Sequence, residues 1–213
     1  ASNDIKKINE VNTGILAVKA NLLKNWLSNL DNNNAQKEYY LTDVIAMAVK
    51  DGFVVETTQP DNEHEVMGVN NRMQLSELER YYQQEQANEL MAGGITLADP
   101  ARIDIRGELS HGQDISIDIN TVIEGNVSIG NNVSIGANCV IRDSKIADDV
   151  VILPMSIIDN ASVGKESKVG PFARLRPGAV LSDSTHIGNF VEIKKSFIGV
   201  GSKVNHLTYV GDS

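Results

Sequence analysis

Aromatic residues are scarce in this chain, at 5% of its 213 residues, and basic residues are outnumbered by acidic ones, 19 to 28. The acidic balance argues against nucleic acid as a main partner, because neutralising phosphates requires a basic face. The single cysteine, Cys139, excludes an internal disulfide and fits a reducing compartment. No apolar run reaches the ~20 residues of a membrane span, and the first residues carry no secretion signal. We therefore expect a cytoplasmic protein without membrane insertion.

The second half of the chain contains a repeat with a period of six. From Ile117 onward an aliphatic residue recurs every six positions, with three steps of five. The series is Ile117, Ile123, Ile129, Ile135, Ile141, Ile146, Ile152, Ile158, Val163, Val169, Leu175, Leu181, Ile187, Ile193, Ile198, Val204 and Val210. Three such hexads would form one triangular coil with its aliphatic residues inside, and stacked coils would share a continuous core. The period predicts a parallel β-helix, because a sandwich of short strands would turn every ~8–12 residues.

The start of the repeat is less regular. Leu97, Ile103, Leu109 and Ile115 keep the six-residue spacing, but in another phase. We therefore predict that the first coil begins near residue 97.

Residues 1–72 have the pattern of alternating strands and helices. Short apolar runs predict strands at residues 14–18, 53–55 and 66–69. Asn21 is a candidate cap for a helix that continues to Leu30. Thr42 is a candidate cap for a second helix over residues 43–50, which Gly52 would end. This pattern is typical of an α/β domain, but the segment contains too few strands and helices to close a doubly wound sheet.

A polar segment joins the two halves. Residues 73–90 contain no glycine or proline and are rich in Glu, Gln, Leu and Tyr, which suits a helix that bridges two domains. We predict an incomplete α/β domain over residues 1–72, a linker helix over 73–93 and a β-helix domain over 94–213.

Five separated segments carry a resemblance to a known family. They are residues 10–14 (EVNTG), 68–72 (GVNNR), 170–178 (GPFARLRPG), 186–195 (HIGNFVEIKK) and 205–212 (NHLTYVGD). In order and over essentially the whole chain, they resemble the bifunctional N-acetylglucosamine-1-phosphate uridylyltransferase/glucosamine-1-phosphate acetyltransferases of bacteria. The resemblance implies a left-handed parallel β-helix, preceded by the end of a Rossmann-like nucleotidyltransferase domain.

The resemblance also implies two reactions that supply precursors of peptidoglycan and lipopolysaccharide. In the first, acetyl-CoA acetylates glucosamine-1-phosphate. In the second, UTP and Mg²⁺ convert the N-acetylglucosamine-1-phosphate to UDP-N-acetylglucosamine. The chain has neither the family's glycine-rich phosphate loop nor its metal-binding aspartate, and the acetyl-CoA contacts would lie beyond Ser213. We therefore expect this chain alone to be inactive in both reactions. The resemblance further implies a homotrimer formed through the β-helix.

The hexad spacing brings two basic residues together. Arg176 follows Leu175 and Lys194 follows Ile193, three hexads later. One coil separates them, so they should stack about 4.8 Å apart on one edge. Like charges at this distance are unfavourable unless an anion lies between them. The phosphate of glucosamine-1-phosphate would supply that anion, with the arginine fork matching its oxygens.

Three further residues belong to this candidate site. Tyr209 and Glu192 precede aliphatic positions of the same column and could contact the sugar or the phosphate. Glu192 could equally pair with a lysine. His206 is the proposed catalytic base by resemblance, since an imidazole can accept the proton that the substrate amine loses. We expect His206 to face Arg176 and Lys194 of a neighbouring subunit.

Two asparagines are implicated by resemblance alone. Asn12 would contact the sugar nucleotide, and Asn70 would bind both the sugar nucleotide and Mg²⁺ through its amide oxygen. The alternative is that each asparagine only caps or turns the chain, as asparagine often does.

Other functions remain as alternatives. A γ-type carbonic anhydrase would need three closely placed histidines. A trimerisation scaffold would need no catalytic set. A sugar-nucleotide pyrophosphorylase would use its β-helix for regulation only. His64, His111 and His186 are expected to be exposed or to have structural roles.

Overall fold

The computed structural model describes Lys7 and residues 12–213, so Glu10 and Val11 of the first motif lie outside the described residues. The chain divides into two compact units, Ala1–Leu75 and Ser76–Ser213.

The described part of the first unit consists of short helices joined by irregular segments. It contains α1 (Ala20–Leu27), α2 (Asp43–Lys50) and a 3₁₀ helix (Glu63–Val66). Trp26 of α1 packs against Val44 and Ala48 of α2, and its indole N–H donates a hydrogen bond to Asp51, 2.8 Å away. No strand forms in residues 12–94. The predicted strands at 14–18, 53–55 and 66–69 are therefore wrong, because these short runs have no neighbouring strand with which to pair.

The predicted helix ends are partly correct. Asn21 does not cap α1, since it lies inside the helix, and the helix follows Lys19 without a side-chain cap. The bounds of α2 match the prediction, and Thr42 occupies the cap position but makes no capping hydrogen bond. Gly52 ends α2 with a φ of +82°. The N–H groups of Gly52 and Phe53 donate to the carbonyls of Val49 and Ala48, a hydrogen-bond pair that closes many helix ends.

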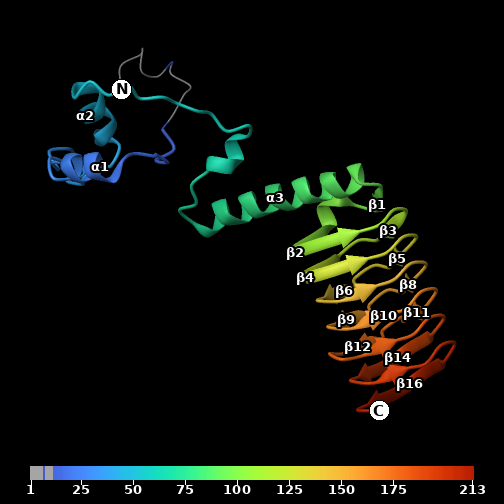
Figure 1. Ribbon diagram of the computed structural model, residues 1–213. Coiled ribbons are helices and arrows are strands. Elements are labelled where there is room, and N and C mark those ends of the chain that lie inside the picture. The colour runs from blue at the N-terminus through green and yellow to red at the C-terminus, as the bar shows by residue number, and fades with distance from the viewer. Residues whose placement is uncertain (1–6, 8–11) are drawn as a thin grey trace. The chain divides into compact units, whose positions relative to one another are not determined.

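The second unit is a column of short parallel strands that follows helix α3 (Figure 1). Helix α3 covers Arg72–Ala92, so residues 73–90 are helical as predicted. The strands are β1 (Ile95–Leu97), β2 (Ile103–His111), β3 (Ile115–Ile117), β4 (Thr121–Ile129), β5 (Ser134–Ile135), β6 (Val140–Arg142), β7 (Lys145–Ile146), β8 (Val151–Ile152), β9 (Ile157–Asp159), β10 (Ser162–Val163), β11 (Lys168–Val169), β12 (Arg174–Leu175), β13 (Val180–Leu181), β14 (His186–Lys194), β15 (Phe197–Ile198) and β16 (Lys203–Gly211).

The strands form three faces of a parallel β-helix, as predicted. All pairs are parallel, and partners lie one coil apart: Ile123 pairs with Ile141, 18 positions later, and Ile141 with Ile158, 17 positions later. One face runs β1-β3-β5-β8-β11-β14, the next β14-β12-β9-β6-β4, and the third β4-β7-β10-β13-β15. The long strands β14 and β4 each turn a corner between two faces.

The predicted aliphatic column forms the core. Its members from Ile117 to Ile198 are buried, whereas Val204 and Val210 on the last coil are partly buried. Cys139 lies in the same core, and burial raises the pKa of its thiol. The three five-residue steps each place a residue at a corner with positive φ: Asp143, Asn160 and Lys195, at 44°, 47° and 46°. Asparagine and aspartate tolerate this conformation better than lysine does.

The first coil begins at β1, near residue 97 as predicted, and Ile103 and Leu109 lie in another phase from the column, as their spacing indicated. Ile123 pairs with Ile105, and Ile129 pairs with His111. The column therefore runs through Ile105 and His111, not through Ile103 and Leu109. The cause is a 3₁₀ turn at Pro100–Arg102, which lengthens the step that follows Leu97. Ile103 and Leu109 nevertheless point inward, since they lie two residues before column positions and alternate residues share a face.

Helix α3 covers the open edge of the first coil. The side-chain amide of Gln83, which is buried, donates to the carbonyl of Ile105 and accepts from its N–H, both at 2.8 Å. Gln83 therefore replaces the neighbouring strand that Ile105 lacks. Ala87 and Leu90 of the helix join the core of the β-helix. The helix thus protects a strand edge that would otherwise be open to pairing with other chains.

Replacing Gln83 with alanine should destabilise the second unit by about 1–3 kcal/mol, because the buried polar groups of Ile105 would lose their partners. Urea denaturation followed by circular dichroism measures the loss of stability as a lower unfolding midpoint. Gln84→Ala is the matched control, since Gln84 only bonds Asn88 on the exposed side of the same helix. Equal midpoints for the two variants would contradict a capping role for Gln83.

Candidate functional site

Charged residues form a ladder along one corner of the β-helix. Arg106, Glu124, Arg142 and Asp159 occupy the same position in four successive coils. Arg106 pairs with Glu124 at 3.1 Å, and Arg142 pairs with both Glu124 and, at 3.8 Å, Asp159. The signs therefore alternate and neutralise one another along the column.

The alternation ends at the two basic residues singled out by the hexad spacing. Arg176 takes the next position in the ladder, and its N–H donates to the carbonyl of Ile193, directly before Lys194. Leu175 and Ile193 are partners in register, so Arg176 and Lys194 lie in adjacent coils. This corner therefore carries two neighbouring positive charges, Arg176 and Lys194. Continued alternation would have placed a negative charge after Arg176.

Each of these cations already has a carboxylate within the chain. Arg176 Nη1 lies 2.8 Å from Glu192 Oε1, and this hydrogen bond raises the pKa of Arg176 further above its usual range. Lys194 Nζ lies 3.3 Å from Asp212 Oδ2. The inference that the two cations need an external anion was therefore incomplete, because Glu192 and Asp212 relieve their repulsion. Glu192 pairs with a basic residue, one of its two expected roles.

Tyr209 lies beside the same pair. It is in register with Glu192, and Gly211 is in register with Lys194. A β-carbon on Gly211 would lie 2.2 Å from the Tyr209 hydroxyl, so that hydroxyl lies directly over Gly211. The structure thus brings Arg176, Lys194, Glu192 and Tyr209 to one corner.

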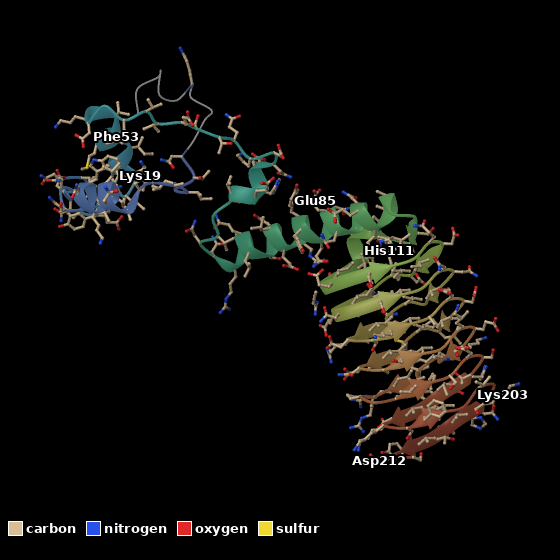
Figure 2. The ribbon with its side chains drawn as sticks, in the orientation of Figure 1. Lys19, Phe53, Glu85, His111, Lys203 and Asp212 are labelled. Atoms are coloured by element: carbon tan, nitrogen blue, oxygen red, sulfur yellow. The ribbon has the colours of Figure 1, made fainter. Side chains whose placement is uncertain are left out.

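His206 lies elsewhere on the same coil. It is in register with Asn189 and is five residues from Gly211, which is Lys194's partner. At ~3.3 Å per residue, this places its backbone up to about 16 Å from that of Gly211. The imidazole is exposed and makes no hydrogen bond or ion pair in the part of the chain that the structure describes. Lys203 precedes His206 by three residues, and Asp212 directly follows Gly211. These two residues lie far apart across the last coil in Figure 2.

An apolar stripe runs along the corner next to His206. Met155, Phe172, Phe190 and Leu207 follow one another at 17- and 18-residue spacing and are 46%, 49%, 54% and 76% exposed. The rings of Phe172 and Phe190 stack with their centroids 5.2 Å apart. Neither this stripe nor Asp212 was predicted from the sequence. The coil spacing itself could have revealed both, since Asp212 lies 17 positions after Lys195.

Of the two asparagines, the structure shows a local role only for the side chain of Asn12. The Asn12 side chain accepts a hydrogen bond from the N–H of Gly14 at 2.8 Å, which is the turn-forming alternative. Asn70 accepts no hydrogen bond through its side chain among the described residues, and its N–H donates to Gln74. Mg²⁺ prefers carboxylate and phosphate oxygens with several waters. The described residues contain no group of acidic or histidine side chains that could hold a metal ion, so this donor set does not fit Mg²⁺.

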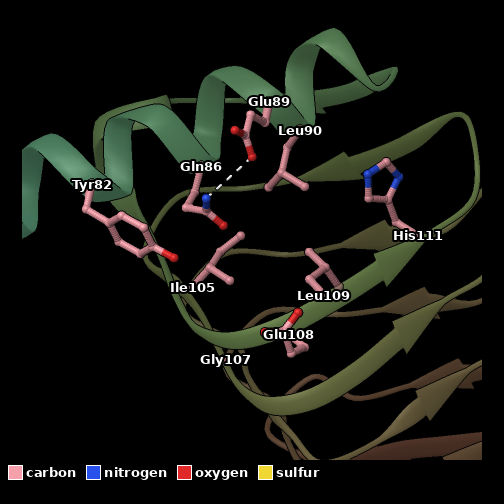
Figure 3. A pocket seen from close by; sticks show the side chains of 9 residues that line it. All are labelled: Tyr82, Gln86, Glu89, Leu90, Ile105, Gly107, Glu108, Leu109 and His111. Atoms are coloured by element: carbon pink, nitrogen blue, oxygen red, sulfur yellow. Dashed lines mark hydrogen bonds between the residues drawn. The ribbon is translucent and has the colours of Figure 1, made fainter. Parts of the chain in front are cut away.

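A groove of about 370 Å³ lies at the opposite end of the β-helix, between α3 and β2 (Figure 3). Its lining consists of Tyr82, Gln86, Glu89, Leu90, Ile105, Gly107, Glu108, Leu109 and His111. The Nδ1–H of His111 donates to the carbonyl of Gly112 at 2.9 Å. His64 bonds Asn62 at 2.8 Å. Both histidines therefore have the structural roles that were expected of them.

The fold and the charged corner define a hexapeptide-repeat protein of the parallel β-helix class. A family model described as the GMPPB C-terminal domain matches residues 105–210. Over all 213 residues, the chain is 60% identical to Bifunctional protein GlmU of Marinobacter nauticus and 53% identical to that of Nitrosospira multiformis. It is therefore related, over its whole length, to a segment of the GlmU proteins. The chain spans 47% and 46% of these two relatives.

Two solved structures have low similarity to part of this chain. The acetyltransferase domain of PglB from Neisseria gonorrhoeae FA1090 has a TM-score of 0.49 and 16% identity, over 60% of this chain and 63% of that one. WeeI from Acinetobacter baumannii AYE has a TM-score of 0.47 and 17% identity, over 60% of this chain and 64% of that one. No helix in the described part of the chain has the length and apolar character to cross a membrane.

Proposed function

We propose that this chain is the central segment of a bifunctional enzyme that makes UDP-N-acetylglucosamine, and that its β-helix binds glucosamine-1-phosphate for acetylation by acetyl-CoA. The observation that carries the proposal is the break in the charge ladder at Arg176 and Lys194. The relation to GlmU proteins supports it independently. The product would serve as a precursor of peptidoglycan and lipopolysaccharide.

In this proposal the corner that carries Arg176 and Lys194, the cationic corner, binds the substrate phosphate. The planar guanidinium of Arg176 matches two phosphate oxygens, and the ammonium of Lys194 adds a compact charge. Tyr209, whose hydroxyl lies over Gly211, donates a hydrogen bond to a sugar or phosphate oxygen. Glu192 holds Arg176 at 2.8 Å through one oxygen, and its other oxygen, 3.9 Å from Arg174, can also accept a hydrogen bond from a sugar hydroxyl. Together these contacts orient the amino group of the sugar.

His206 is the proposed general base. The amine attacks the thioester carbonyl of acetyl-CoA and forms the amide bond, while the carbon–sulfur bond breaks and coenzyme A leaves as the thiol. The imidazole accepts the proton that the amine loses, and can pass it to the departing sulfur. Its freedom from other hydrogen bonds among the described residues suits this role.

We further propose that the site is completed in a homotrimer. His206 and the cationic corner lie at different corners of one coil, up to about 16 Å apart along the strand, so a base from one subunit would face the cations of the next. The exposed stripe of Met155, Phe172, Phe190 and Leu207 beside His206 gives that contact an apolar surface.

Uridylyl transfer is proposed for the full-length enzyme only. Asn12 and Asn70 keep their proposed sugar-nucleotide contacts, but the described residues do not form a Mg²⁺ site. The chain alone is therefore expected to catalyse neither reaction, and a cytoplasmic location stays a prediction.

The phosphate site can be tested with binding measurements on this chain. Lys194→Ala and Arg176→Ala should each weaken binding of glucosamine-1-phosphate by about tenfold or more, because a hydrogen bond to a charged group contributes ~1.5–3 kcal/mol. Isothermal titration calorimetry measures the affinities. Lys165→Ala is the control, since Lys165 pairs with Asp148 at another corner. Unchanged affinity in both site variants would show that the phosphate binds elsewhere.

A further inference from the structure

Asp212 contacts Lys194, a member of the cationic corner, and the next residue, Lys195. Its carboxylate lies 3.3 Å from Lys194 Nζ and 4.0 Å from Lys195 Nζ. Its N–H donates to the carbonyl of Lys194 at 3.0 Å, which fixes the backbone of Asp212 one coil away from that residue. The carboxylate therefore occupies the surroundings of Lys194 that a substrate phosphate would enter.

We propose that Asp212 is an internal counter-ion which the phosphate must displace from Lys194, and that it thereby sets which anions the corner accepts. This inference rests on the proposed function, because it assumes that Lys194 binds the phosphate. It assigns Asp212 a specificity-determining role and no part in the chemical step.

The two ion pairs of the corner differ in how easily they open. Glu192 contacts Arg176 at 2.8 Å, has a second arginine, Arg174, at 3.9 Å, and its side chain is 33% exposed. Asp212 contacts Lys194 at the longer distance of 3.3 Å and is 55% exposed. Exposed ion pairs of this kind contribute a factor of at most about 5 to an equilibrium. The Asp212 pair is therefore the one that opens, while Glu192 keeps Arg176 in place.

The opening requires only a side-chain rotation. The backbone of Asp212 is held by its hydrogen bond to Lys194, so the carboxylate can leave Lys194 without movement of the coil. A phosphate dianion can replace it, because it carries more charge and also reaches Arg176. A simple carboxylate such as acetate cannot, since it has the same charge as Asp212 and lacks the advantage of being attached to the chain.

The test uses this 213-residue chain, with inorganic phosphate and acetate as probes in calorimetric titrations at constant ionic strength. We expect Asp212→Asn to bind phosphate about 2–5-fold more tightly, the factor that loss of an exposed pair allows. It should also bind acetate measurably, which the wild-type chain should not. The acetate result separates this role from a purely structural one, because a damaged corner would lose affinity for both anions.

The matched control is Asp148→Asn, which removes a carboxylate paired with Lys165 at 2.9 Å on another corner and should change neither affinity. If Lys194→Ala weakens phosphate binding but Asp212→Asn leaves it unchanged or also weakens it, the inference is overturned. If phosphate binding is absent in the wild type, or is insensitive to Lys194→Ala, the proposed phosphate site fails and the inference fails with it. Circular dichroism confirms that each variant is folded.

Discussion

Replacing Ile158 with alanine should destabilise the β-helix by about 2–5 kcal/mol, because the truncation leaves a cavity in a closely packed column. Ile158 is fully buried and stacks between Ile141 and Leu175 of the adjacent coils. Each coil depends on its neighbours for its apolar contacts. The loss should therefore affect the coils on both sides of the substitution.

Urea denaturation of this chain, followed by circular dichroism, measures the effect as a shift of the unfolding midpoint. Ile157→Ala removes the same atoms one residue earlier, from a side chain that is 40% exposed. This variant should lose much less free energy of unfolding, since less of the Ile157 side chain is removed from water by folding. Equal losses in the two variants would mean that the hexad column is not what holds the coils together.

The column was predictable because one physical requirement repeats in every coil. A residue such as Leu175 must point into a narrow prism, and its partner Ile193 must do the same one coil later. The period therefore appears directly in the sequence. The first coil begins near residue 97 as predicted, and the 3₁₀ turn at Pro100–Arg102 accounts for its different phase, because the turn changes the spacing without interrupting the apolar pattern. Alternate residues of a strand share a face, so Ile103 and Leu109 point inward although they lie off the column.

The strands predicted in residues 1–72 were wrong for a different reason. A short apolar run such as residues 53–55 indicates an extended segment, but a strand also requires a hydrogen-bonded neighbour. That neighbour is a property of the whole fold, which local sequence does not contain. The helix Asp43–Lys50 was predictable because its hydrogen bonds and its terminating Gly52 are local.

The candidate site was likewise only partly predictable from the sequence. The register places Arg176 and Lys194 in adjacent coils, which the spacing alone predicted. The ion pairs of these residues with Glu192 and Asp212 depend on side-chain conformations, and spacing does not reveal these. The spacing places Asp212 17 positions after Lys195, one coil later. Its contacts with Lys194 and Lys195 depend on side-chain conformations, and for that reason its role was missed.

Replacing His206 with alanine in the full-length enzyme should lower the turnover of acetyl transfer by about 10²–10⁴-fold, the contribution typical of a general base. Affinity for glucosamine-1-phosphate should change little, because Arg176 and Lys194 carry that binding in the proposal. Uridylyl transfer should be unchanged, since it is assigned to the other domain. Release of the coenzyme A thiol measures the first reaction, and release of pyrophosphate from UTP measures the second.

A pH profile distinguishes a base from a structural histidine. If His206 accepts the proton, the fall in wild-type turnover at low pH, where an imidazole is protonated, should disappear from the residual activity of the variant. His186→Ala is the matched control, because His186 lies on the neighbouring strand β14, in register with Lys203, and has no proposed role. It should retain both activities. Acetyl transfer that survives in His206→Ala would make His206 structural, and the base would then have to come from another residue.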